Sequence, residues 1–151
     1  MSNILDEASL LACFKPEDRN QVDIPQELKF PLEVSDYATW MEGSGARVYL
    51  VFKDHPTSLP KGIVFRRSPP HVESAAMCDW CHCVRKGHVS LLTTQTKVNK
   101  SVGLYLCNDL SCKNKVQGNP HPDDLSEFLD PDEKIQKIMA RISRFAKSHL
   151  Y

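Results

Sequence analysis

The chain has 151 residues, of which 41% are hydrophobic and 25% charged, as expected for a globular protein of about one domain. Its nineteen basic residues balance nineteen acidic ones, so the net charge indicates neither a nucleic-acid partner nor a membrane surface. No apolar run reaches the ~18 residues that span a bilayer and the acidic start lacks a secretory pattern, so we expect a cytoplasmic protein without membrane contact, where disulfides are disfavoured.

The first third of the chain predicts little regular structure. Apolar residues in Asn3–Phe14 recur at helical spacing and predict an amphipathic helix. Three prolines make Lys15–Leu32 an irregular connection. Ser35–Met41 predicts a short turn or helix anchored by Trp40, and the glycines of Gly43–Gly45 predict a turn.

Four later segments are rich in β-branched and aromatic residues and predict strands. They are Arg47–Phe52, Gly62–Arg67, His88–Gln95 and Val102–Cys107. Because the connections within each successive pair are short, we expect antiparallel pairing. The predicted fold class is α+β, a small antiparallel sheet with flanking helices.

The last segment predicts a helix with clear start signals. Asp130 is suited to the N-cap and Pro131 to the first helical position. Apolar residues then recur at three- and four-residue spacing and are expected to face the core: Ile135, Ile138, Met139, Ile142 and Phe145. The basic residues between them are expected to be solvated: Lys134, Lys137, Arg141, Arg144 and Lys147.

The cysteines give the most specific signal in the sequence. Cys78 and Cys81 form a C-x2-C pair, and Cys107 and Cys112 form a C-x4-C pair. Two close pairs separated by a hairpin-length segment predict a four-cysteine site for one structural Zn²⁺. With a helix predicted at Leu110–Gln117, the zinc turn, hairpin and helix make a treble-clef arrangement.

The basic residues around the cysteines suit such a site. Between Val84 and Lys115 the chain carries six basic residues and one acidic residue. Four of the basic residues lie close to the cysteines, where they would offset the negative charge of four thiolates: Arg85, Lys86, Lys113 and Lys115.

Other interpretations of the cysteines fit less well. A redox dithiol sits at a helix start in a βαβ context, whereas this C-x2-C precedes a predicted strand. A catalytic zinc keeps one open position, which four thiolates would close. Cys83, His82 and His88 compete for ligand positions, and Cys83 in place of Cys81 would also give an x4 spacing. Cys13 lies far away and is interpreted as a core residue.

Three stretches carry a family resemblance: GLYLCNDLSCKNKV (Gly103–Val116), AAMCDWC and GIVFRR. Together they resemble the C-terminal treble-clef zinc-finger domain of the elongation factor G-binding proteins, a family that includes proteins conferring fusidic acid resistance. The most specific part is the motif Y-x-C-x-D-x-x-C. The resemblance extends over almost the whole chain and implies a single domain of this type over residues 1–151, with the zinc finger at about 77–118.

The resemblance implies a binding protein with no catalysis and no small-molecule substrate. Family members bind elongation factor G and help to release it from the ribosome. The zinc ligands carry over to the same four cysteines. Partner contacts are implied by position for Trp80, Lys100, Tyr105 and Phe128, of which Tyr105 alone lies inside the aligned motif.

Several alternatives stay open from the residues themselves. Trp80 could instead cover the small finger core. If Leu104 and Leu106 face inward, Tyr105 is exposed by alternation, and exposed aromatics among basic residues also suit ribosomal or other RNA. A zinc hydrolase or deaminase would need H-x-E or HExxH, which the sequence lacks. Members that confer drug resistance carry a further N-terminal helical domain, for which this chain has no room, so drug rescue is not implied.

Overall fold

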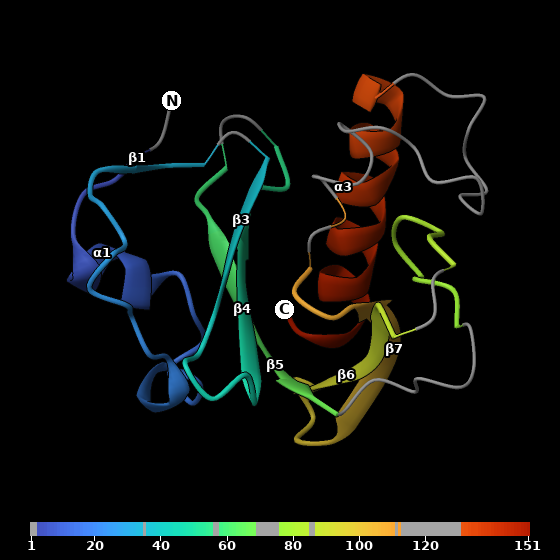
Figure 1. The fold of residues 1–151 in the computed structure, drawn as a ribbon. Helices are drawn as coiled ribbons and strands as arrows, with labels where there is room; N and C mark the ends of the chain where they lie inside the picture. Colours follow the sequence, from blue (N-terminus) through green and yellow to red (C-terminus); the bar gives the residue numbers. More distant parts are fainter. Residues whose placement is uncertain are drawn as a thin grey trace. The chain divides into compact units, whose positions relative to one another are not determined.

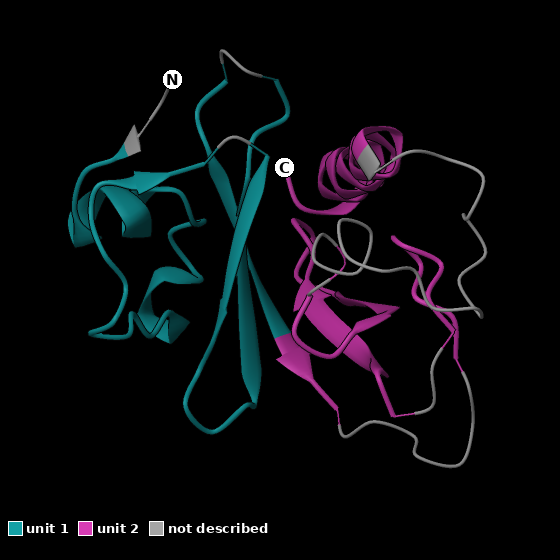
Figure 2. Ribbon diagram, turned by 45° about the horizontal axis from the view of Figure 1, so that its top comes forward, with its two compact units in different colours: residues 1–65 teal, residues 66–151 magenta. Residues whose placement is uncertain are grey.

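The computed structural model describes residues 3–34, 36–55, 58–68, 76–84, 87–110, 112 and 131–151. Figure 1 shows the fold of the chain. The chain forms two compact units, unit 1 (Met1–Phe65) and unit 2 (Arg66–Tyr151), which are coloured separately in Figure 2. The boundary falls inside a strand, and the sequence analysis did not predict it. The single family domain over residues 1–151, with a zinc finger at about 77–118, stays a prediction.

The main sheet has five strands in chain order. They are β3 (Tyr37–Met41), β4 (Arg47–Phe52), β5 (Lys61–Arg67), β6 (Val89–Gln95) and β7 (Ser101–Cys107). The registers of β3 with β4, of β5 with β6 and of β6 with β7 are antiparallel. The predicted α+β class is confirmed, and each of the four predicted strands matches within one residue at each end.

Two segments of unit 1 differ from prediction. The helix expected over Asn3–Phe14 is α1 (Glu7–Ala12), because the Asp6 carboxylate accepts a hydrogen bond from the Ser9 amide (2.8 Å) and caps the start. The turn or helix expected at Ser35–Met41 is wrong, because Tyr37–Met41 pairs with β4 as strand β3. Short elements complete the unit: β1 (Asn3–Ile4), η1 (Arg19–Gln21) and β2 (Leu32–Glu33), with β1 paired to β2.

The core of unit 1 is organised around three aromatic rings. Phe14 meets Trp40 and Tyr49 edge-on, with ring centroids 6.1 and 6.5 Å apart. Gly62 lies against this cluster, because a Cβ added there would come within 2.5 Å of the Phe14 ring. Its amide donates to the Cys13 carbonyl (2.8 Å). Glycine therefore allows β5 to approach the segment that follows α1.

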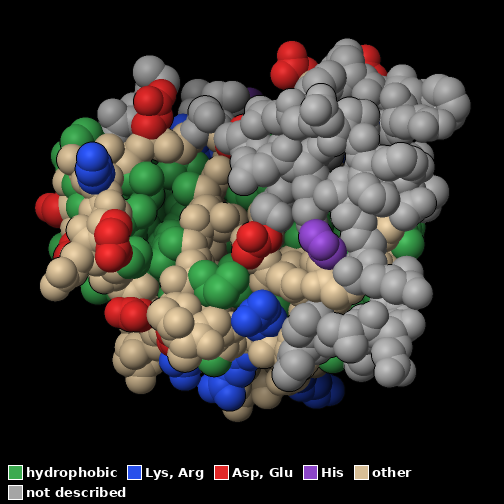
Figure 3. Space-filling view, viewed as in Figure 1, with side chains coloured by type: hydrophobic (Ala, Val, Ile, Leu, Met, Phe, Trp, Pro, Cys, Tyr) green, Lys and Arg blue, Asp and Glu red, His purple; other side chains and the backbone are tan. Residues whose placement is uncertain are grey.

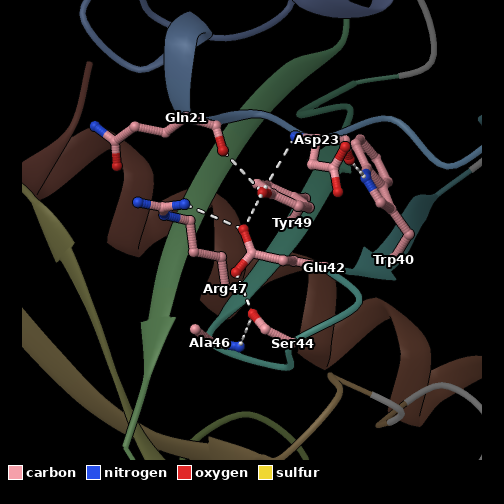
Figure 4. A network of polar contacts seen from close by, with 8 residues as sticks. All are labelled: Gln21, Asp23, Trp40, Glu42, Ser44, Ala46, Arg47 and Tyr49. Atoms are coloured by element: carbon pink, nitrogen blue, oxygen red, sulfur yellow. Dashed lines mark hydrogen bonds and ion pairs between the residues drawn. The ribbon is translucent and has the colours of Figure 1, made fainter.

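A polar network lies at one end of this aromatic cluster (Figure 4). The Tyr49 hydroxyl donates to the Gln21 carbonyl (2.8 Å) and accepts from the Asp23 amide (3.2 Å). The Trp40 indole donates to the Asp23 carbonyl (2.8 Å), and Arg47 pairs with Glu42 (3.1 Å). Burial raises the pKa of Tyr49, so its hydroxyl stays protonated and available as a donor. The network thus fixes the irregular segment after α1 against β3 and β4.

Unit 2 combines β6, β7 and the end of β5 with helix α3 (Pro131–His149). Four residues of the predicted stripe are confirmed as buried, Ile135, Ile138, Ile142 and Phe145, and the fifth, Met139, is half-buried. Lys134 is only 8% exposed, so its predicted solvation is wrong.

Two further sequence predictions concern the ends of helices. Leu110 has a φ of +58°, so the helix expected at Leu110–Gln117 does not begin there. Residues 111 and 113–117 lie outside the described residues, and so does the predicted cap Asp130.

Replacing Tyr49 with Phe tests the network. The variant leaves the Asp23 amide and the Gln21 carbonyl without their partner. Because these hydrogen bonds are only partly buried, we expect unit 1 to lose about 1 kcal/mol of unfolding free energy. Urea unfolding followed by Trp40 fluorescence in a Trp80→Phe background would measure the loss. Tyr105→Phe, which changes an exposed hydroxyl, is the control and should stay within about 0.5 kcal/mol. Equal unfolding curves for the two variants would contradict this account.

Candidate metal centre

The four predicted ligands come together in unit 2. Cys78 and Cys81 lie in the turn before β6, Cys107 is the last residue of β7, and Cys112 is helical. All four are buried, and their sulfur atoms lie within 4.8 Å of one another. The Cys78 and Cys112 sulfurs are 3.6 Å apart, and the Cys81 and Cys107 sulfurs are 3.5 Å apart. Each of these two sulfur contacts therefore joins one cysteine of the C-x2-C turn to one cysteine of the later C-x4-C segment.

This geometry fits one tetrahedral zinc ion. Zinc–sulfur bonds of about 2.3 Å place tetrahedral sulfurs about 3.8 Å apart, close to the separations observed. Four thiolates are soft ligands that select zinc over calcium or magnesium. The arrangement confirms the prediction of one structural Zn²⁺.

The first cysteine pair is shaped by a tight turn. The Cys78 amide donates to the Cys83 carbonyl (2.9 Å), and the His82 amide donates to the Cys78 carbonyl (2.9 Å). The Cys81 amide lies 3.5 Å from the Cys78 sulfur and points a donor at it. His82 adopts a left-handed φ of +62°, which reverses the chain after the second cysteine. The turn thereby places both sulfurs on the same side.

Asp79 fastens this turn to strand β7. Its amide donates to the Tyr105 carbonyl (2.7 Å), and its carboxylate accepts from the Tyr105 amide (3.0 Å). Burial raises the pKa of Asp79, and the neighbouring Cys78 charge adds to the shift. Sequence reasoning missed this residue, although an acidic side chain inside a C-x2-C turn was visible. The contact brings Cys78 and Cys81 beside Cys107.

Asn108 performs a similar role at the other side of the hairpin. Its amide donates to the His88 carbonyl (2.9 Å), and its side-chain nitrogen donates to the Gly87 carbonyl (2.7 Å). Its side-chain oxygen accepts a short hydrogen bond from the Ser90 hydroxyl. Asn108 was also not predicted. It closes the ends of β6 and β7 directly after the ligand Cys107.

The electrostatics of the sulfurs favour the binding of a cation. Burial raises the pKa of the Cys78 thiol, but hydrogen bonds from the Cys107, Cys112 and Cys81 thiols outweigh burial and hold that pKa well below its usual value. The pKa of Cys112 is raised by its contacts with Cys107 and Cys78 and by burial. Without a metal, the cluster thus favours one thiolate over four. A divalent ion would stabilise the remaining thiolates and release their protons.

The competing ligands do not join the group. Cys83 is buried, yet the converging set found among the described residues contains Cys78, Cys81, Cys107 and Cys112. Neither His82 nor His88 belongs to that set. Cys13 lies in unit 1, where its partly buried thiol donates to the Ser9 carbonyl (3.4 Å). The basic residues expected to offset the site charge lie outside the described residues: Arg85, Lys86, Lys113 and Lys115.

The predicted partner contacts differ in their surroundings. Tyr105 is 43% exposed, and Lys100 is exposed directly before β7. Leu106 is buried, as the alternation predicts. Trp80 is only 3% exposed. Phe128 lies outside the described residues. The partner roles of all four stay predictions.

Trp80 packs inside unit 2. Its ring meets Phe145 of α3 at 6.4 Å between centroids, and Arg141 donates to its backbone carbonyl. This placement agrees with the alternative interpretation of Trp80 as a cover over the finger. The indole also joins the turn that carries two ligands to the last helix.

Cys107→Ser should remove the metal. A serine hydroxyl is a poor substitute for a thiolate, so we expect the variant to lose zinc and to unfold the hairpin region, since structural zinc contributes about 10 kcal/mol in small fingers. Elemental analysis and Trp80 fluorescence would measure both effects. Cys83→Ser is the matched control and should retain one zinc per chain. Retention of one zinc and a native spectrum by Cys107→Ser would contradict the ligand set.

Asp79→Ala should loosen the zinc turn without deleting a ligand. The Tyr105 amide loses its acceptor, so zinc transfer to a chelator should be about tenfold faster than in the wild type. Asp79→Asn keeps an oxygen acceptor and should remain within about threefold of the wild-type rate. Equal rates for the alanine and asparagine variants would show that the carboxylate does not hold the turn.

Comparisons with known proteins agree with this geometry. Residues 7–148 match the family described as the FBP C-terminal treble-clef zinc-finger. Among solved structures, that of the fusidic acid resistance protein FusC aligns with 89% of this chain at 24% identity and a TM-score of 0.50. The chain spans 58% of the FusC chain, and a likeness at this identity shows the fold. Among curated proteins, none matches significantly. Within the described ranges, no helix is long and apolar enough to cross a membrane.

Proposed function

The chain belongs to the FBP C-terminal treble-clef zinc-finger family, and on this premise we propose that it is a non-enzymatic protein that binds translation elongation factor G. FusC, which shares the fold, is a fusidic acid resistance protein. The proposed place of action is the cytoplasm, where the factor works on the ribosome. Release of the factor from the ribosome is part of the proposal, and drug rescue is not.

The closed metal centre supports a binding role. Four thiolates occupy all the positions of a tetrahedral zinc ion and leave none for a water nucleophile. All four cysteines are buried. Zinc in such a centre acts by joining the turn, the end of β7 and Cys112, so that the hairpin keeps one shape. The proposal depends mainly on this closed centre, in which four buried sulfurs fix the shape of a hairpin whose outer face is exposed.

The exposed surface is the odd-numbered face of β6 and β7. Tyr105 pairs with Leu91 and Gly103 pairs with Thr93 across the two strands, so their side chains share one face. Tyr105 and Gly103 are exposed on this face, and Lys100 is exposed just before β7. An exposed tyrosine on a strand face is typical of protein–protein interfaces, where aromatic residues are enriched. Trp80 is not part of the proposed contact, because its ring is buried.

Calorimetry with purified elongation factor G tests the proposal. Tyr105→Ala should weaken binding about tenfold or more, because truncation of a central aromatic removes its contact area. Leu59→Ala is the control, since Leu59 is 80% exposed and lies in unit 1. Zinc content should be equal in all variants.

Two outcomes would count against the proposal. Absence of binding by the wild-type protein at tens of micromolar would remove it. Binding to ribosomal RNA alone, with an affinity that falls steeply with salt, would favour the RNA-binding alternative instead.

A further inference from the structure

Strand β7 is an edge of the main sheet, and only part of that edge is covered within the described residues. Strand β6 pairs with β7 on one side. On the other side, Asp79 occupies the backbone amide and carbonyl of Tyr105. The turn that carries Cys78 and Cys81 therefore pairs with β7 as a neighbouring strand would, but only at the one residue Tyr105. The edge continues beyond it, from Tyr105 towards Ser101.

The backbone direction at Gly103 and Ser101 follows from these contacts. In an antiparallel strand the amide and carbonyl of one residue point to the same side, and successive residues alternate. The backbone amide and carbonyl of Tyr105 point away from β6, towards Asp79. The backbone amides and carbonyls of Gly103 and Ser101 therefore also point away from β6. The even-numbered residues face β6, as the hydrogen bond from the Thr96 amide to the Lys100 carbonyl (2.6 Å) confirms. Two residues thus present two donors and two acceptors at the edge.

This stretch of edge is open. Ser101 and Gly103 are both exposed. Their outward amides and carbonyls have no hydrogen-bond partner in the part of the chain that the structure describes. Exposed edges attract further strands, and proteins usually cover them or place charges on them. Here Asp79 covers the Tyr105 position, while the next two outward positions are not covered by any of the described residues.

Gly103 makes close approach to the edge easier. It carries no side chain, and a Cβ built there would lie 3.0 Å from the Leu91 side chain and 3.3 Å from that of Thr93. The Leu91 and Thr93 side chains therefore extend over the strand at this point. An incoming strand would meet bare backbone beside an apolar surface.

The charges near the edge favour an acidic occupant. Lys97 and Lys100 are exposed at the β6–β7 turn, and Arg66 is exposed on the row that contains Thr93 and Gly103. None of the three cations has a carboxylate partner among the described residues. Figure 3 shows basic side chains along the lower border of the described surface.

The turn that presents two of these cations is well fixed. The Thr96 hydroxyl accepts from the Lys100 amide (3.1 Å), and the Lys97 amide donates to the His149 carbonyl (2.8 Å) at the end of α3. Lys97 and Lys100 are therefore held beside the open edge.

We propose that Ser101–Gly103 is a strand-addition site, at which an extended acidic segment of the partner protein pairs with the outer edge of β7. The proposal rests on the proposed function, because the partner is elongation factor G. Alternating donors and acceptors about 7 Å apart match the repeat of an extended polypeptide. RNA could bind to the cations and to Tyr105. It has no polypeptide backbone, however, and so could not pair with the open amides and carbonyls of β7.

Two variants of Gly103 distinguish the loss of a backbone hydrogen bond at the edge of β7 from the addition of a side chain on the face of the strand. Gly103→Pro removes the outward amide, and Gly103→Ala adds the same Cβ while keeping that amide. Proline is tolerated at edge positions whose amide faces solvent, and Val102 before it already lies in a strand. The alanine variant is the matched reference, because it carries the added Cβ but keeps the amide. We expect the proline variant to bind elongation factor G about tenfold or more weakly than the alanine variant.

Amide hydrogen exchange of the complex is the second measurement. In the wild-type protein, binding should slow exchange at Ser101 and Gly103, while Val102 and Leu104, which already bond to β6, should change little. If Gly103→Pro loses zinc, this exchange result decides the matter by itself.

The outcomes separate the inference from the proposed function. Equal affinities of the proline and alanine variants, or unchanged exchange at Ser101 and Gly103 in the complex, would overturn strand addition and leave factor binding intact. No binding by the wild-type protein would remove both. An effect of the variants on RNA binding alone would also overturn strand addition.

Discussion

The convergence of four buried sulfurs is the constraint on which unit 2 depends. The ligands come from a turn, from the end of β7 and from a helical residue, so no single element holds them together. One zinc ion joins the three segments and contributes on the order of 10 kcal/mol of folding free energy. Removal of the ion would leave crowded thiols that cannot all ionise.

The metal centre and the exposed strand are connected by a few hydrogen bonds. Asp79 lies between two ligands and pairs with the backbone of Tyr105, and Asn108 follows a ligand and closes the hairpin. The metal therefore determines the position of the residue that we expect to contact the partner. A surface fixed in this way loses little entropy on binding, which favours affinity. The same Asp79 contact also determines where the covered part of the β7 edge ends.

Local sequence patterns predicted the elements whose cause is local. The four predicted strands were recognised because they are rich in β-branched and aromatic residues. The metal ligands were recognised from the spacing of the two cysteine pairs. Strand β3 was missed because its pairing depends on β4, where Trp40 lies opposite Tyr49. The burial of Trp80 depends on α3, more than fifty residues away in the chain, and so could not be derived from the C-x2-C turn. Leu110 was placed in a helix because its left-handed backbone has no sequence signal.

X-ray absorption at the zinc edge tests the central claim most directly. The measurement reports the number and type of atoms bound to the metal in the intact protein. The account predicts one zinc per chain with four sulfur neighbours at about 2.3 Å and no nitrogen or oxygen neighbour. A first shell that contains oxygen or nitrogen, or a protein purified under reducing conditions without zinc, would contradict it.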